Sequence, residues 1–151
     1  MTGLAGVAGT IFASEEQRAQ RAIEEFGKNL KKGGVGLFYY SGHGAQVDGV
    51  NYLIPIESRM ATERSLKNDS VSLDRVFDQM ELAQNAVNFV ILDACRTNPL
   101  QRSTRADVRG LAYTDAPTGM IIAYATAPGK TASDGSGNNS PYTEELVRYM
   151  R

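Results

Sequence analysis

Two short polar motifs, each at the end of an apolar run, constrain this sequence more than any other feature. Residues 35–40 are almost continuously apolar and lead into Ser41-Gly42-His43-Gly44; residues 89–92 lead into Asp93-Ala94-Cys95-Arg96. Apolar runs of this length are typical of strands that are covered on both faces of a parallel sheet. If the two strands are neighbours, both motifs emerge at the same carboxyl edge, where open α/β sheets place their active sites.

Helical and strand patterns alternate along the rest of the chain. Apolar residues recur at helical spacing after residue 14, after Ser72 and after Ser140-Pro141, and strands are expected at 35–40, 52–54, 88–92 and 120–124. Asp48-Gly49 is a turn signal between the first two strands. The pattern predicts an α/β fold, a mostly parallel sheet with helices on both faces. We expect one domain over residues 1–151, with residues 1–13 as an atypical N-terminus.

Composition excludes several classes of function. The net charge is −1, so nothing in the totals suggests a nucleic-acid or anionic-membrane partner. No apolar run approaches the length of a membrane span. One cysteine and one histidine form neither an intrachain disulfide nor a four-ligand structural zinc site. The first residues lack the basic start of a signal peptide, so we expect a cytoplasmic location, with the periplasm as the alternative.

The single histidine and the single cysteine are His43 and Cys95, and a thiol beside an imidazole is the minimal nucleophile–base pair. The alternatives are a buried core cysteine and an ordinary loop histidine. Against the first, Cys95 lies just beyond its apolar run, and Asp93 precedes it by two residues, on the same side of a strand. Against the second, Gly42 and Gly44 bracket the imidazole and leave the backbone bare for a substrate. The N–H groups of Gly44 and Cys95 are candidates for an oxyanion hole.

Together and in this order, the two motifs resemble those of the caspase-like cysteine peptidases, within them the metacaspases and their bacterial relatives, the orthocaspases. Caspases carry a histidine ~50 residues upstream of the cysteine. The likeness runs from about residue 14 to the end and includes Arg109-Gly110-Leu111 and residues 123–129. It implies a three-layer α/β/α sandwich and a catalytic dyad of His43 and Cys95. It also implies that Ser41 and Asp93 lie in the pocket for the residue before the cut.

A carboxylate in that pocket favours a cationic partner. Arginine makes a bidentate contact with a carboxylate and lysine a point contact. We therefore expect a cysteine endopeptidase that cuts peptides and proteins after Arg or Lys and rejects aspartate by like-charge repulsion. Asp93 also disfavours the thiolate of Cys95 until a cationic side chain binds, so a substrate would help to activate its own nucleophile.

Two further features bear on regulation. The segment after Cys95 contains Arg102, Arg105 and Arg109, either on a solvated surface loop or as sites of self-cleavage by an Arg-specific peptidase. Many metacaspases need calcium, and Glu57 and Asp69 lie in the relevant stretch. The sequence has no dense carboxylate cluster, so we expect no required metal or other cofactor.

The family normally begins with a strand, a helix and a second strand that this sequence lacks before residue 14. The absent strand would lie beside residues 35–40, so one edge of that strand is expected to be unpaired. An unpaired edge favours pairing with a second copy, which gives a homodimer, or with another chain. The alternative to a peptidase is therefore a catalytically silent interaction module that needs a partner chain to complete its sheet.

Overall fold

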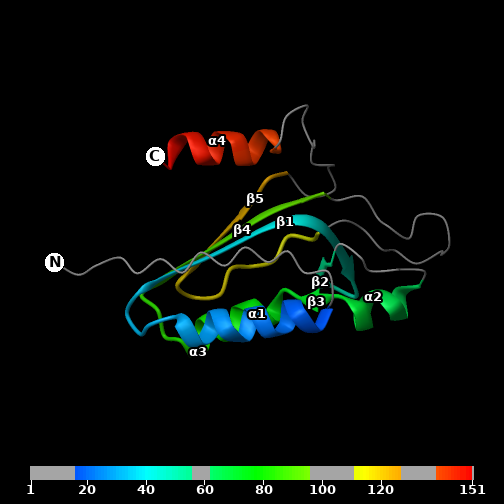
Figure 1. Cartoon of the computed structure of the whole chain (residues 1–151), viewed down its shortest axis with the longest axis horizontal. Helices are drawn as coiled ribbons and strands as arrows, with labels where there is room; N and C mark the ends of the chain where they lie inside the picture. The colour runs from blue at the N-terminus through cyan, green and yellow to red at the C-terminus, as the bar shows by residue number, and fades with distance from the viewer. Residues whose placement is uncertain (1–15, 56–61, 96–110, 127–138, 151) are drawn as a thin grey trace.

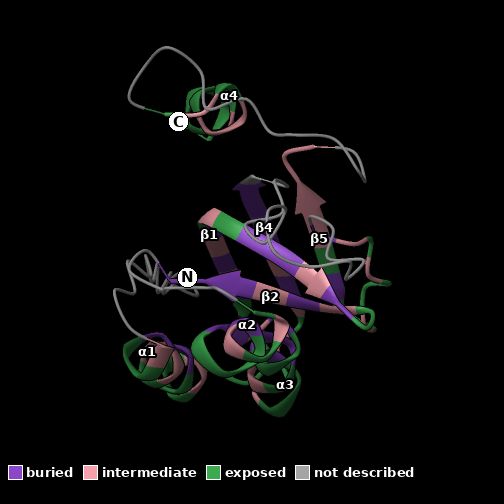
Figure 2. Cartoon of the chain, turned by 90° about the vertical axis from the view of Figure 1, so that its right-hand side faces the viewer, coloured by how far each residue is buried: buried purple, intermediate pink, exposed green. Residues whose placement is uncertain are grey.

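The computed structural model describes residues 16–55, 62–95, 111–126 and 139–150. Its helices are α1 (Glu16–Asn29), α2 (Glu63–Asp69), α3 (Asp74–Leu82) and α4 (Pro141–Tyr149). Its strands are β1 (Val35–Val47), β2 (Val50–Ile54), β3 (Val71–Ser72), β4 (Val87–Cys95) and β5 (Met120–Tyr124). α1, α2 and α3 cover one face of the sheet and α4 lies over the other (Figures 1 and 2). The expected three-layer α/β/α sandwich is confirmed.

The sheet has the strand order β3-β2-β1-β4-β5 and is mixed. The pairs β1–β4 and β4–β5 are parallel, whereas β1–β2 and β2–β3 are antiparallel. The two apolar runs of the sequence are therefore neighbouring parallel strands, as predicted. Asp48 and Gly49 both have positive φ (51° and 84°), which is the conformation of the two-residue turn that joins β1 to β2.

The core lies between the sheet and the helices α1 and α3. Ala19, Ile23 and Phe26 of α1 are buried, and Phe26 contacts Phe38 of β1 with ring centroids 6.1 Å apart. The predicted stripe of α3 is buried as well: Leu73, Val76, Phe77 and Met80. Leu73 occupies the N-cap position of α3, and the Ser72 hydroxyl accepts a hydrogen bond from the Asp74 N–H.

The opposite face is covered less than the apolar pattern indicated. Along β1, residues at even positions from 36 to 40 are buried, and those at odd positions from 35 to 39 are exposed or half-buried. Val35 is 44% exposed, and no residue of α4 is buried. The prediction of a strand covered on both faces is therefore wrong for β1. Its apolar run alternates between a packed face and a more open one.

β1 also has an open edge. Residues 35–42 pair with β4 on one side, and pairing with β2 begins only at His43. Among the described residues, no strand lies beside the other edge of residues 35–42. The predicted unpaired edge is thus present in the part of the chain that the structure describes.

Candidate active site

Strand register brings the two motifs together. In the parallel β1–β4 pair, His43 is the partner of Cys95 and Ser41 is the partner of Asp93. Backbones of neighbouring strands lie ~4.8 Å apart, so residues distant in the chain become adjacent here. The motifs lie within the strands and do not follow them, because β1 continues to Val47 and β4 to Cys95.

The four paired residues share one face of the sheet. Ser41 and His43 are two positions apart on β1, as Asp93 and Cys95 are on β4, and side chains two positions apart on a strand lie on the same face. Ser41 and His43 are exposed. For Cys95 the structure describes the backbone and the register position, and not the side chain. The roles of His43, Cys95, Gly44, Ser41 and Asp93 stay predictions.

Tyr40 fixes the backbone at the histidine. Its side chain is buried on the core face, and its hydroxyl lies 2.8 Å from the carbonyl oxygen of His43 and 2.9 Å from that of Ile54. The hydroxyl has one proton to share between these two acceptors. Burial raises the pKa of the Tyr40 phenol. The Tyr40 phenol therefore links β1 to the end of β2 beside His43, the candidate general base.

The glycines that bracket His43 accommodate protein side chains. A Cβ atom at Gly44 would lie 2.7 Å from the side chain of Leu111, and one at Gly42 would lie 2.8 Å from the Tyr40 hydroxyl oxygen. Both distances are shorter than real Cβ contacts. On the core face, these glycines therefore make room for protein side chains, and the expectation that they leave the backbone bare for a substrate stays a prediction. Their lack of a side chain allows Tyr40 and Leu111 to pack beneath the site.

Asn51 holds the segment that carries Leu111. The side chain of Asn51 is 2% exposed. Its Nδ2 donates to the Ala112 carbonyl at 2.9 Å and to the Thr114 hydroxyl at 2.8 Å, and its Oδ1 accepts from the Ala112 N–H at 2.8 Å. These three bonds fix the segment from Leu111 to Thr114 against β2, immediately beside the histidine-bearing part of β1.

Asp93 lies at the N-terminus of α4. The residue is 4% exposed, and Oδ2 accepts hydrogen bonds from the hydroxyls of Ser140 and Thr143. Among the described residues, no ion pair reaches it. Burial raises the pKa of the nearby Tyr142 phenol, and the negative charge of Asp93 raises it further. The candidate specificity acid is thus bonded to neutral hydroxyls and placed at the positive end of a helix dipole.

Several of these contacts have weak sequence signals or none. The sequence predicts a helix after Ser140-Pro141, and Ser140 caps α4, but its bond to Asp93 joins distant parts of the chain. Nothing in the sequence around Asn51 or Tyr40 indicated their partners. Both residues lie next to recognisable signals, the Asp48-Gly49 turn and the histidine motif.

Some predictions lie outside the described residues, namely Arg102, Arg105, Arg109 and Glu57. Asp69, the other calcium candidate, ends α2. In the four described ranges, no group of three or more His, Cys, Asp or Glu residues is arranged to hold a metal ion. No helix in those ranges has the length and hydropathy needed to cross a membrane.

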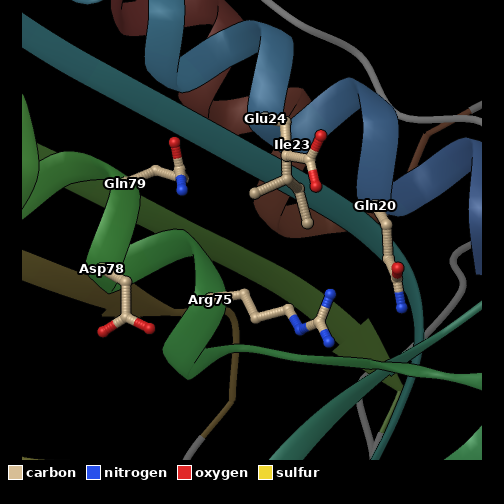
Figure 3. Close-up of a pocket in the computed structure, with 6 residues that line it drawn as sticks. All are labelled: Gln20, Ile23, Glu24, Arg75, Asp78 and Gln79. Atoms are coloured by element: carbon tan, nitrogen blue, oxygen red, sulfur yellow. The ribbon is translucent and has the colours of Figure 1, made fainter.

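A shallow cavity of about 220 Å³ lies elsewhere, between α1 and α3 (Figure 3). Its lining is mostly charged or amide side chains: Gln20, Ile23, Glu24, Arg75, Asp78 and Gln79. It belongs to the helical layer on the far side of the sheet from α4 and includes none of the candidate site residues.

Comparison with known proteins agrees with the geometry. A family model described as the caspase domain matches residues 13–151. The chain is 26% identical over 117 residues to the human (Homo sapiens) mucosa-associated lymphoid tissue lymphoma translocation protein 1, covering 78% of this chain and 14% of that protein. It is 25% identical over 155 residues to a probable protease of a Desulfuromonadales bacterium, covering 97% of this chain and 19% of that protein. The chain thus spans less than a fifth of either relative. Because the family match extends over most of the sequence, the chain belongs to the caspase domain family of peptidases.

Proposed function

We propose that this protein is a cysteine endopeptidase that cleaves peptide bonds after Arg or Lys. The observation that carries the proposal is the register of β1 and β4, which pairs the only histidine with the only cysteine. Membership of a peptidase family and the likeness to a probable protease support the same reaction class.

In the proposed mechanism, the His43 imidazole takes the proton from the Cys95 thiol, and the thiolate attacks the carbonyl carbon of the scissile bond. The tetrahedral oxyanion collapses as protonated His43 gives its proton to the leaving amine, and a thioester remains on Cys95. A water molecule, deprotonated by His43, then attacks the thioester. The acid product leaves and the thiol is restored.

The N–H groups of Gly44 and Cys95 would hold the oxyanion. The two-residue turn places Val47 and Val50 in a hydrogen-bonded pair, and such pairs alternate along an antiparallel ladder. Gly44 and Leu53 are then a non-hydrogen-bonded pair, so the Gly44 N–H points away from β2 and toward the side of β1 where β4 runs. The N–H therefore faces the strand that carries Cys95, and its role toward an oxyanion stays a prediction. A donor of this kind is worth ~3–4 kcal/mol to the transition state in other hydrolases.

Asp93 would select the basic side chain. It lies next to Ser41 and two positions before Cys95, on the same face of the sheet. Among the described residues Asp93 has no cationic partner. A buried carboxylate gains more from a guanidinium or ammonium group than an exposed one does, because water screens it less. The same charge would repel a substrate aspartate.

Turnover of fluorogenic peptides tests this function. Peptides that differ only in the residue before the cut (Arg, Lys, Asp or citrulline) would be assayed with the wild type, Cys95→Ala and His43→Ala. We expect cleavage of the Arg and Lys peptides only, and loss of all cleavage in both variants. Cleavage that survives Cys95→Ala, or equal rates on Arg and Asp, would refute the proposal.

A second candidate function is a silent interaction module, which the open edge of β1 favours. Among the described residues, no strand satisfies the backbone groups at this edge of residues 35–42, and another strand would do so, for example residues 35–42 of a second copy. Native mass measurement across a concentration series checks this mode. A monomer at every concentration would rule out the homodimer, and peptide turnover by that monomer would rule out the silent module.

A further inference from the structure

We propose that Ser140 and Thr143 are positioning residues for the Asp93 carboxylate: they hold its Oδ2, so that Oδ1 is the oxygen offered to a basic substrate side chain. The inference rests on the function proposed above and extends it, because it assigns a role in specificity to the first turn of α4. Neither motif in β1 or β4 contains these residues.

The hydroxyls form a directed set of donors. Thr143 Oγ1 lies 2.5 Å from Asp93 Oδ2, and Ser140 Oγ bonds the same oxygen. The N–H of Thr143 donates to Ser140 Oγ at 3.0 Å, which leaves the Ser140 proton for Asp93. The Tyr39 hydroxyl lies 2.5 Å from Thr143 Oγ1. A hydroxyl has one proton, so Tyr39 donates to Thr143 and Thr143 donates to Asp93.

Among the described residues, little else fixes the position of α4. No residue of the helix is buried; Val147 is 45% exposed, and the C-cap residue Met150 is 64% exposed. The bonds to Asp93 therefore define where the helix begins more than its packing does. In Figure 1 the helix lies above the strands, on the face that carries the candidate site.

This arrangement limits how a cation can bind. Each carboxylate oxygen has two lone pairs, and both bonds that Asp93 accepts from described residues go to Oδ2. A bidentate guanidinium would compete with the hydroxyls for Oδ2, whereas a contact through Oδ1 would leave them in place. With the hydroxyls present, the carboxylate is held in one rotamer before the substrate arrives, which reduces the ordering cost of binding.

The experiment measures binding, so it does not depend on turnover. Fluorescein-labelled peptides that end in arginine amide or in citrulline amide, its neutral isostere, would be titrated into Cys95→Ala protein and followed by anisotropy. Thr143→Val removes the hydroxyl at nearly constant volume, and Thr143→Ser keeps it as the matched control. Circular dichroism verifies that each variant is folded.

We expect the affinity ratio of arginine over citrulline to fall about tenfold in Thr143→Val, the effect of one hydrogen bond to a charged group. We expect Thr143→Ser to keep the parent ratio. If Thr143 had a purely structural role, Thr143→Val would weaken the binding of both peptides equally and leave the affinity ratio unchanged. That result would overturn this inference alone, provided that Asp93→Asn removes the preference for arginine. A parent protein without any preference for arginine would overturn the proposed specificity together with this inference.

Discussion

Replacing Asn51 with alanine would remove three partly buried hydrogen bonds at once. The side chain bonds the carbonyl and the N–H of Ala112 and the hydroxyl of Thr114, at 2.8–2.9 Å. Each such bond contributes ~0.5–1.5 kcal/mol, so we expect Asn51→Ala to lower the free energy of unfolding by about 2–4 kcal/mol. The loss would loosen the segment that packs Leu111 under Gly44, so peptidase activity should fall as well.

Urea denaturation measures the change, and hydrogen exchange of the Ala112 amide locates it. We expect a lower midpoint with an unchanged m-value, together with faster exchange at Ala112. Asn29→Ala at the exposed end of α1 is the control, with an expected change within about 0.5 kcal/mol. A loss below about 1 kcal/mol for Asn51→Ala, or equal losses in the two variants, would refute this account of the segment.

Four further predictions concern the site. Burial raises the pKa of Tyr40, so the folded state binds the phenol proton more tightly than the unfolded state does. The resulting contribution to the free energy of unfolding is fully present below pH ~10, the pKa of an unperturbed tyrosine, and is lost as the pH rises further. Urea midpoints at about pH 8 and about pH 11 should therefore differ less in Tyr40→Phe than in the wild type. Gly44→Ala should cost ~1–3 kcal/mol by thermal unfolding, because the new methyl group would overlap Leu111. Calcium and chelator should leave peptide turnover equal, and a chelator-sensitive rate would show that a metal is required. A non-cleavable arginine peptide should accelerate alkylation of Cys95 by a small neutral reagent, by neutralising Asp93, and equal rates would contradict that coupling.

The fold was predictable where local patterns and global packing agree. The two apolar runs, the Asp48-Gly49 turn and the stripe of α3 each depend on spacing alone, and the structure has all three. Helix α2 was missed because Ser65, and not Glu or Gln, completes its capping box with Thr62. The end of β1 was missed because its last residues pair with β2, a tertiary contact that no local pattern reports.

The residues of the candidate site were predictable from the sequence, whereas the hydrogen bonds and packing contacts around them were less so. A lone histidine and a lone cysteine on successive strands indicated the pairing that the register shows. The bonds from Ser140 and Thr143 to Asp93 join positions separated by a long connection, and sequence spacing carries no information on them. Tyr40 and Leu111 pack against the motif glycines on the core face, a tertiary contact that the motif itself does not indicate.

The pH dependence of Cys95 alkylation tests the central claim most directly, because the chain has a single thiol. If the imidazole of His43 stabilises the thiolate, the wild type should react well below the ordinary thiol pKa of ~8.5, and His43→Ala should move the rate profile toward that value. Profiles of the two proteins that superimpose would show that the histidine and the cysteine do not act as a pair.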